Sequence, residues 1–200
     1  MSDHYYTSLP LSSEKLFKIE NVLIRGDFYS FYTAPGVFSS KKIDKGTLLL
    51  AEYMAVPKGH LLDLGCGIGV LGIVAAKSSP KTQVILTDVN VRATWLTRKN
   101  VELNGVKQNV RVRTGNLYEP VKKEKFDAIV SNPPVSAGLK VIEELVEGSK
   151  TVLTKGGKLQ LVVRKGVKAI MKSMEKTFGN VEIVKKKGGY NILKNVNKDA

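Results

Sequence analysis

The sequence is poor in the residues that build disulfides and metal sites. It has one cysteine, Cys66, and two histidines, His4 and His60, in 200 residues. One cysteine excludes an internal disulfide framework and a zinc site built from several cysteines, and two histidines this far apart give no ligand cluster. We therefore expect no metal site.

Long hydrophobic runs are also missing. No apolar stretch of the sequence is long enough to span a bilayer. The polar N-terminus, MSDHYYTSLP, lacks the positive start and the apolar stretch of a secretory signal. The sequence therefore predicts a cytoplasmic protein with no membrane partner.

Acidic residues are scarce relative to basic ones. The chain has 18 Asp and Glu against 32 Lys and Arg, which gives a net charge of +14. Such an excess favours a polyanionic partner, because phosphates neutralised by Lys and Arg release condensed counterions. The basic residues are densest at residues 122–125 and 185–187. We expect a nucleic acid as partner; a lysine-rich solvated surface is the alternative interpretation.

The length is sufficient for one domain with a sizeable core. We expect a single domain over residues 1–200, with an N-terminal extension at residues 1–45 and a catalytic core at residues 46–200. In the extension, two apolar runs flank Arg25-Gly26-Asp27 and predict a β-hairpin. The Arg-Gly-Asp triplet is interpreted as the turn and not as an adhesion motif.

From residue 60 onward, predicted strands and helices alternate. The strands cover residues 60–64, 83–88, 109–115, 126–131, 158–164, 181–187 and 190–196, and the helices cover residues 69–78, 91–105, 139–153 and 167–178. A further helical pattern runs over residues 48–54. This order predicts an α/β fold with a doubly wound, seven-stranded, mostly parallel sheet and an antiparallel edge hairpin.

The first core strand runs into a glycine-rich loop, LLDLGCGIGVLG. Glycines 65, 67 and 69 between a strand and a helix allow a sharp turn and a ligand lying against the backbone. Asp88, at the end of the next strand, can accept both hydroxyls of a ribose. A dinucleotide would bring its pyrophosphate to this loop, and Asp63 would repel it. A ligand with a sulfonium, an ammonium and a ribose fits better, so the sequence predicts S-adenosylmethionine as cofactor.

The fourth core strand stops at Ser131-Asn132-Pro133-Pro134. In a doubly wound sheet its carboxyl end should lie beside the glycine loop, across the crevice where the strand order reverses. The Asn132 side-chain carbonyl and the Pro133 main-chain carbonyl can each accept one N–H of an exocyclic amine. Pro133 and Pro134 stiffen the loop. We therefore predict methyl transfer to such an amine, with Asn132, Pro133 and Pro134 as the catalytic residues.

Together, LDLGCGIG, SNPPV and the N-terminal TAPGVFSSKKIDKGT resemble the methyltransferase small-domain family. This is a family of class I, Rossmann-like methyltransferases that includes bacterial 16S rRNA guanine-N2 methyltransferases and stand-alone archaeal relatives. The resemblance implies a role in rRNA processing and RNA binding. It also implies a set of cofactor-binding residues: Thr47, Asp63, Gly65, Cys66, Gly67, Ile68, Asp88, Val89, Asn116, Leu117 and Asn132. Cys66 is expected to pack beneath the cofactor and not to act as a nucleophile.

Two departures from the family pattern affect the substrate. The motif position that is usually aromatic and would stack on the flipped base is Val135 here. The ring of Phe38, Tyr118 or Tyr190 would have to replace it. This favours guanine N2 over adenine N6. The bacterial enzymes also carry an extra methyltransferase-like domain, so target recognition is expected from residues 1–45, from the basic face or from a second copy of the chain. The substrate candidates are Phe38, Lys42, Val135 and Arg164.

The predicted function is S-adenosylmethionine-dependent methylation of an exocyclic base amine in RNA, with guanine N2 of ribosomal RNA, naked or in a small ribosomal subunit, as the expected target. One alternative is a protein glutamine methyltransferase of the release-factor type, which shares Asn-Pro-Pro. Another is a non-catalytic RNA-binding module. A nicotinamide dehydrogenase is the most distant alternative.

Overall fold

The computed structural model describes residues 16–38, 42–133 and 138–199. The α-helices in this part are α1 (Lys45–Tyr53), α2 (Val70–Ser78), α3 (Val91–Leu103), α4 (Leu139–Val152) and α5 (Val167–Phe178). The strands are β1 (Phe17–Ile24), β2 (Asp27–Thr33), β3 (His60–Leu64), β4 (Gln83–Asp88), β5 (Val110–Thr114), β6 (Phe126–Ser131), β7 (Leu153–Val163), β8 (Glu182–Lys187) and β9 (Tyr190–Val196).

The main sheet has 7 strands in the order β5-β4-β3-β6-β7-β9-β8. β3 pairs in parallel with both β4 and β6, whereas β9 runs antiparallel to both β7 and β8. The predicted doubly wound sheet with an antiparallel edge hairpin is therefore confirmed. The strand order reverses at β3, so the carboxyl ends of β3 and β6 lie side by side, where such folds bind their ligands.

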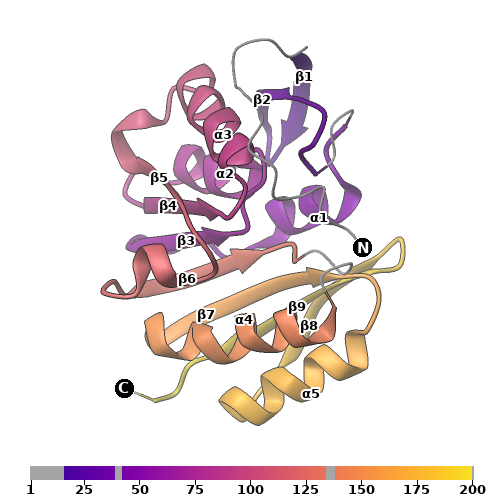
Figure 1. The fold of residues 1–200 in the computed structure, drawn as a ribbon. Helices are drawn as coiled ribbons and strands as arrows, with labels where there is room; N and C mark the ends of the chain where they lie inside the picture. Colours follow the sequence, from indigo (N-terminus) through magenta and orange to yellow (C-terminus); the bar gives the residue numbers. More distant parts are fainter. Residues whose placement is uncertain (1–15, 39–41, 134–137, 200) are drawn as a thin grey trace.

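Helices cover both faces of this sheet. Figure 1 shows α1, α2 and α3 on one face and α4 and α5 on the other. Neighbouring residues of β3 pack on opposite faces of the sheet. Leu61 belongs to the core beneath α1–α3, and Leu62 belongs to the core beneath α4 and α5. Because successive strand residues point to opposite faces, a strand covered on both faces is apolar throughout, as HLLDL nearly is.

The N-terminal hairpin predicted from the sequence forms a separate two-stranded sheet of β1 and β2. Its turn is Arg25-Gly26, with φ of 53° and 83°, a two-residue turn that needs left-handed backbone at both positions. Asp27 already belongs to β2. The hairpin docks on α3, where the Asn100 amide donates to the carbonyl of Tyr32 at 3.0 Å and accepts from its N–H at 2.6 Å.

The largest error in the predicted strand boundaries concerns the fifth core strand. The sequence places the start of the fifth core strand at Lys158, after a Lys-Gly-Gly loop, but β7 begins at Leu153. The glycines join the strand because the C-terminal segment pairs with them: Gly156 N–H donates to Asn197 O at 2.7 Å, and Asn197 N–H donates to Gly157 O at 2.8 Å. That pairing joins segments far apart in the chain, and local glycine content gives no sign of it.

Candidate active site

The loop between β3 and α2 is built on three left-handed glycines. Gly65, Gly67 and Gly69 have φ of 70°, 56° and 88°, a region that other residues enter only with strain. The N–H groups of Gly65 and Cys66 both donate to Thr87 O at 2.9 Å, which ties the loop to β4. The glycines therefore have a conformational reason for their spacing, and the loop lies at the carboxyl edge of the sheet.

Asp63, the last but one residue of β3, is 1% exposed. Its Oδ2 accepts from the Gly72 N–H at 2.8 Å, whereas its Oδ1 has no hydrogen-bond partner among the described residues. Burial raises the pKa of this carboxyl to about 7, the Gly72 N–H opposes the rise, and the nearby Asp88 adds to it. A buried carboxylate with an unused oxygen suits a cationic donor such as an ammonium group.

Asp88 ends β4 and faces the same pocket. Its two oxygens accept from the N–H groups of Gly67 and Asn90, both at 2.8 Å. Burial raises its pKa, and these backbone donors limit the rise. The carboxylate is thus fixed beside the glycine loop, where its remaining lone pairs can accept ribose hydroxyls. Asn90 itself caps α3, because its side chain accepts from the N–H of Arg92 at 2.9 Å.

Cys66 is half-buried in the glycine loop, with its Sγ 3.7 Å from the hydroxyl of Thr97. Burial raises the pKa of the Cys66 thiol well above its usual value, and the charges of Asp88 and Asp63 add to the rise. A thiol that stays protonated is a poor nucleophile. These surroundings favour a packing role for Cys66.

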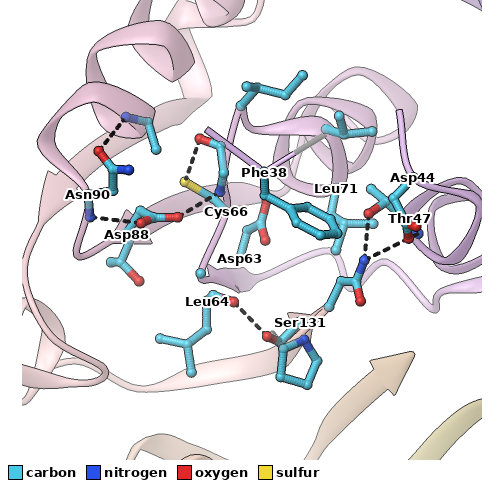
Figure 2. A pocket seen from close by; sticks show the side chains of 18 of the residues that line it. Phe38, Asp44, Thr47, Asp63, Leu64, Cys66, Leu71, Asp88, Asn90 and Ser131 are labelled. Atoms are coloured by element: carbon cyan, nitrogen blue, oxygen red, sulfur yellow. Dashed lines mark hydrogen bonds between the residues drawn. The ribbon is translucent and has the colours of Figure 1, made fainter. Parts of the chain in front are cut away.

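Asn132 follows β6 on the other side of the crevice. Its Nδ2 donates to Asp44 Oδ2 at 3.0 Å and to Thr47 Oγ1 at 2.8 Å. The preceding residue, Ser131, ties β6 to β3 by donating its hydroxyl to Leu64 O at 2.7 Å. In Figure 2, Asp44 and Thr47 lie at one end of the pocket and Asp88 and Asn90 at the other. The Asn132 amide and the Asp88 carboxylate thus lie at opposite ends of one site.

These groups enclose a cavity of about 770 Å³, which is within the size range of small-molecule sites. Most of the residues predicted for cofactor and substrate line it: Phe38, Thr47, Asp63, Gly65, Cys66, Gly67, Ile68, Asp88, Val89, Asn116, Leu117, Asn132, Pro133 and Arg164. Lys42 is exposed but does not line the cavity. Pro134 and Val135 lie outside the described residues.

The three candidate stacking rings have different environments. Phe38 lines the cavity and is 49% exposed, and Figure 2 shows its ring between Asp63 and Thr47. Tyr190 also lines the cavity. Tyr118 instead packs against α4 and donates its hydroxyl to Leu145 O at 2.7 Å, so proposing it as a stacking ring was wrong. Its sequence position beside Asn116 and Leu117 does not reveal that, unlike them, it does not line the cavity.

Asp44 was not among the predicted site residues, yet it lines the pocket and contacts both Asn132 and the candidate ring Tyr190. Asp44 is the N-cap of α1 and contacts Asn132, and Tyr190 donates its hydroxyl to Asp44 Oδ1 at 3.1 Å. An aspartate before a helical pattern is an N-cap signal, so the sequence offered a reason for Asp44 to be present. It offered no sign of the contact with Asn132.

The part of the chain that the structure describes holds no group of three or more His, Cys, Asp or Glu residues placed to bind a metal ion. In the same residues, no helix combines the length and the apolar character needed to cross a membrane.

Dehydrogenases of similar topology bind a pyrophosphate at the glycine loop, and the buried Asp63 disfavours one here. The fold and the site define a class I methyltransferase. The family model described as methyltransferase small domain matches residues 28–194, and the chain belongs to this family.

Two relatives are similar in sequence to most of this chain. The protein YbxB of Bacillus subtilis (strain 168) is 35% identical over 97% of this chain and 98% of its own. Ribosomal RNA small subunit methyltransferase C of Hamiltonella defensa is 38% identical over 80% of this chain and 48% of its own. This chain spans about half the length of that relative.

A solved structure agrees over nearly the whole chain. It is the T. thermophilus 16S rRNA N2 G1207 methyltransferase (RsmC) in complex with AdoMet and guanosine. It is 28% identical, with a TM-score of 0.81, over 96% of this chain and 52% of the other. The predicted family and fold are therefore confirmed.

Proposed function

We propose that the protein transfers a methyl group from S-adenosylmethionine to an exocyclic amine of an RNA base, and that the base is guanine in ribosomal RNA, methylated at N2. The observation that carries the proposal is the Asn132 amide, held at one end of a cavity whose other end holds Asp88. The similarity to RsmC, whose structure contains AdoMet and guanosine, supports the same chemistry.

The cavity fits the proposed cofactor. Bound S-adenosylmethionine supplies an electrophilic methyl group on its sulfonium. The unused Oδ1 of Asp63 can accept its ammonium, and Asp88 can accept its ribose hydroxyls. Val89 is 43% exposed at the cavity, where its side chain can pack on the adenine. Asn116 and Leu117 line the cavity and would meet the adenine edge.

Asn132 and Pro133 would hold the substrate amine. Their carbonyl oxygens each accept one N–H, which orients the nitrogen lone pair toward the methyl group. The nitrogen then forms the new N–C bond as the C–S bond breaks, and the cationic product nitrogen releases its proton to water. Alignment of the reacting atoms can supply up to ~7–11 kcal/mol of the barrier reduction, so no strong base is needed.

The net charge of +14 supports an RNA substrate over a protein amide. A base paired in a duplex must first be unstacked or flipped to reach a buried pocket. Recognition of the target is proposed to come from the N-terminal extension, the basic face or a second copy of the chain. A small ribosomal subunit in the cytoplasm is the expected site of action.

The test is tritium transfer from labelled S-adenosylmethionine to RNA that lacks the modification, followed by nucleoside analysis, for the wild type and Asn132→Ala. We expect label in N2-methylguanosine, lost in the variant even at saturating cofactor. Label in another nucleoside would keep the mechanism and change the base. If no RNA is labelled but cofactor binds, ribosomal particles and then glutamine peptides are the next substrates. Absence of both cofactor binding and transfer would favour the RNA-binding module.

A further inference from the structure

The side-chain amide of Asn132 has a defined orientation. Its nitrogen donates to Asp44 Oδ2 at 3.0 Å and to Thr47 Oγ1 at 2.8 Å. A primary amide nitrogen carries two hydrogens and accepts none, so both hydrogens are used. An inverted amide would place its oxygen against the Asp44 carboxylate, where no hydrogen is available to share. The amide oxygen is therefore directed away from α1.

Asp44 is itself fixed from several sides. Its Oδ2 accepts from the N–H groups of Gly46 at 2.8 Å and Thr47 at 3.1 Å, which caps α1. Its Oδ1 accepts from the hydroxyl of Tyr190 at 3.1 Å. The carboxylate therefore has little freedom to rotate, and the contact with Asn132 joins a rigid helix start to the end of β6.

Gly46 makes room for this arrangement. A Cβ at Gly46 would lie 2.7 Å from the ring of Tyr190, so any side chain there would push the ring away from Asp44. The guanidinium of Arg164, which also lines the pocket, lies 5.5 Å from the centre of the same ring. In the segment of residues 44–47, Asp44 and Thr47 therefore contact Asn132, and Gly46 leaves room for Tyr190 beside Asp44.

We propose that Asp44 and Thr47 are positioning residues, which fix the Asn132 amide so that its oxygen, and not its nitrogen, faces the substrate. The inference rests on the proposed methyl transfer. An exocyclic amine offers N–H donors, and only the amide oxygen can accept them. A ring nitrogen without hydrogen is itself an acceptor, so it cannot form a hydrogen bond with the amide oxygen. The orientation therefore selects amines over unprotonated ring nitrogens.

Two variants separate positioning from helix capping. In Asp44→Ser the N-cap is kept, because serine caps as well as aspartate does, but the shorter side chain does not reach Asn132. In Asp44→Asn an oxygen remains for both the cap and Asn132. We expect kcat for RNA to fall about 10- to 100-fold in Asp44→Ser, since misplacement by about 1 Å can cost as much. Because the cap is kept, the thermal midpoint should change little; kcat is measured at saturating cofactor, and Asp44→Asn should recover most of the lost rate.

A second readout needs no substrate. Solvent exchange of the two Asn132 side-chain amide hydrogens can be followed by NMR, with the signals assigned by their loss in Asn132→Ala. We expect slow exchange in the wild type, and fast exchange in Asp44→Ser. Equal exchange in both proteins, or an unchanged kcat in Asp44→Ser, would overturn the inference. If the wild type transfers no methyl group, the proposed function fails, and the exchange rates still decide whether Asp44 fixes the amide.

Discussion

At the scale of single residues, the site brings together two carboxylates that burial makes reluctant to ionise. Burial raises the pKa of both Asp63 and Asp88, and the charge of Asp88 raises the pKa of Asp63 further. Asp88 is compensated by two backbone N–H groups, whereas Asp63 keeps one oxygen without a partner among the described residues. A bound cation resolves this imbalance, so the binding of a cationic ligand should depend on the ionisation of Asp63.

We predict that cofactor affinity rises with pH over roughly pH 6–8, because the pKa of Asp63 is about 7 and only its ionised form attracts the ammonium. In Asp63→Asn, binding should be weak and independent of pH. Calorimetric titration at several pH values measures both. A variant that binds as tightly as the wild type would contradict the role given to Asp63.

Ionisation of Asp63, which should strengthen cofactor binding, should lower the stability of the fold. The pKa of Asp63 in the folded chain, about 7, lies above the ordinary value of 3.8. Its contribution to stability is therefore complete below the ordinary value and is lost as pH rises through about 7. Without cofactor, Asp63→Asn should have a higher thermal midpoint than the wild type at alkaline pH. The difference should shrink in acid.

Another residue-scale prediction concerns base stacking. We expect Phe38→Leu to weaken RNA binding by ~1–3 kcal/mol, the usual loss for one base–aromatic contact. The cofactor Kd should not change. Phe28→Leu is the comparison variant, because Phe28 is 63% exposed on the N-terminal extension and does not line the cavity, so it reports RNA contacts made outside the pocket. Equal effects of the two variants on RNA binding, measured by filter binding, would argue against a stacking role for Phe38.

At the scale of elements, the start of α2 is where backbone conformation and packing are most tightly coupled. Gly69 is the N-cap of α2, with φ of 88°, and a Cβ there would lie 2.8 Å from Thr97 Cγ2. Gly105, after α3, also has a positive φ, of 70°, but a Cβ there would meet nothing within 4 Å. The two glycines share the strained conformation and differ in the space around them.

We therefore predict that Gly105→Ala lowers the free energy of unfolding by about 1 kcal/mol, from backbone strain alone. Gly69→Ala should lower it by at least ~1 kcal/mol more, because its added methyl group must displace packed side chains. Urea denaturation of both variants measures the difference. Equal losses would mean that the packing around Gly69 relaxes freely.

At the scale of the whole molecule, the basic residues are not equivalent. Lys186 and Lys187 lie at the tip of the β8–β9 hairpin, where Lys187 pairs with the pocket residue Tyr190. Lys122 and Lys123 precede β6, whose carboxyl end carries Asn132, so they lie at the opposite edge of the sheet. All four are exposed. Only the hairpin pair is placed to meet RNA whose target base occupies the pocket.

A further prediction compares the two lysine pairs. Replacing Lys186 and Lys187 with Gln should reduce the salt dependence of RNA affinity, measured as the slope of log K against log salt, by roughly 1–2 units, because each lost phosphate contact releases about one counterion fewer. The matched double variant at Lys122 and Lys123 should leave the slope near that of the wild type. A larger effect of the second pair would place the RNA on the opposite edge.

The sequence by itself determined the features that depend on local pattern. Alternating apolar runs and helical periodicity predicted the α/β fold, because those periods are properties of the chain over a few residues. The spacing of Gly65, Gly67 and Gly69 predicted the loop, since glycine is needed wherever the backbone turns left-handed. Topology then placed Asn132 beside that loop through a general rule on strand order.

Only the tertiary structure decided what those residues touch. The hydrogen bond between Asn132 and Asp44 joins positions 88 residues apart, and that between Tyr190 and Asp44 joins positions 146 apart. The turn of Tyr118 toward α4, and the pairing that draws Gly156 into β7, are contacts of the same kind. Side-chain direction and long-range pairing depend on what packs nearby once the sheet has formed, and no short stretch of sequence contains that information.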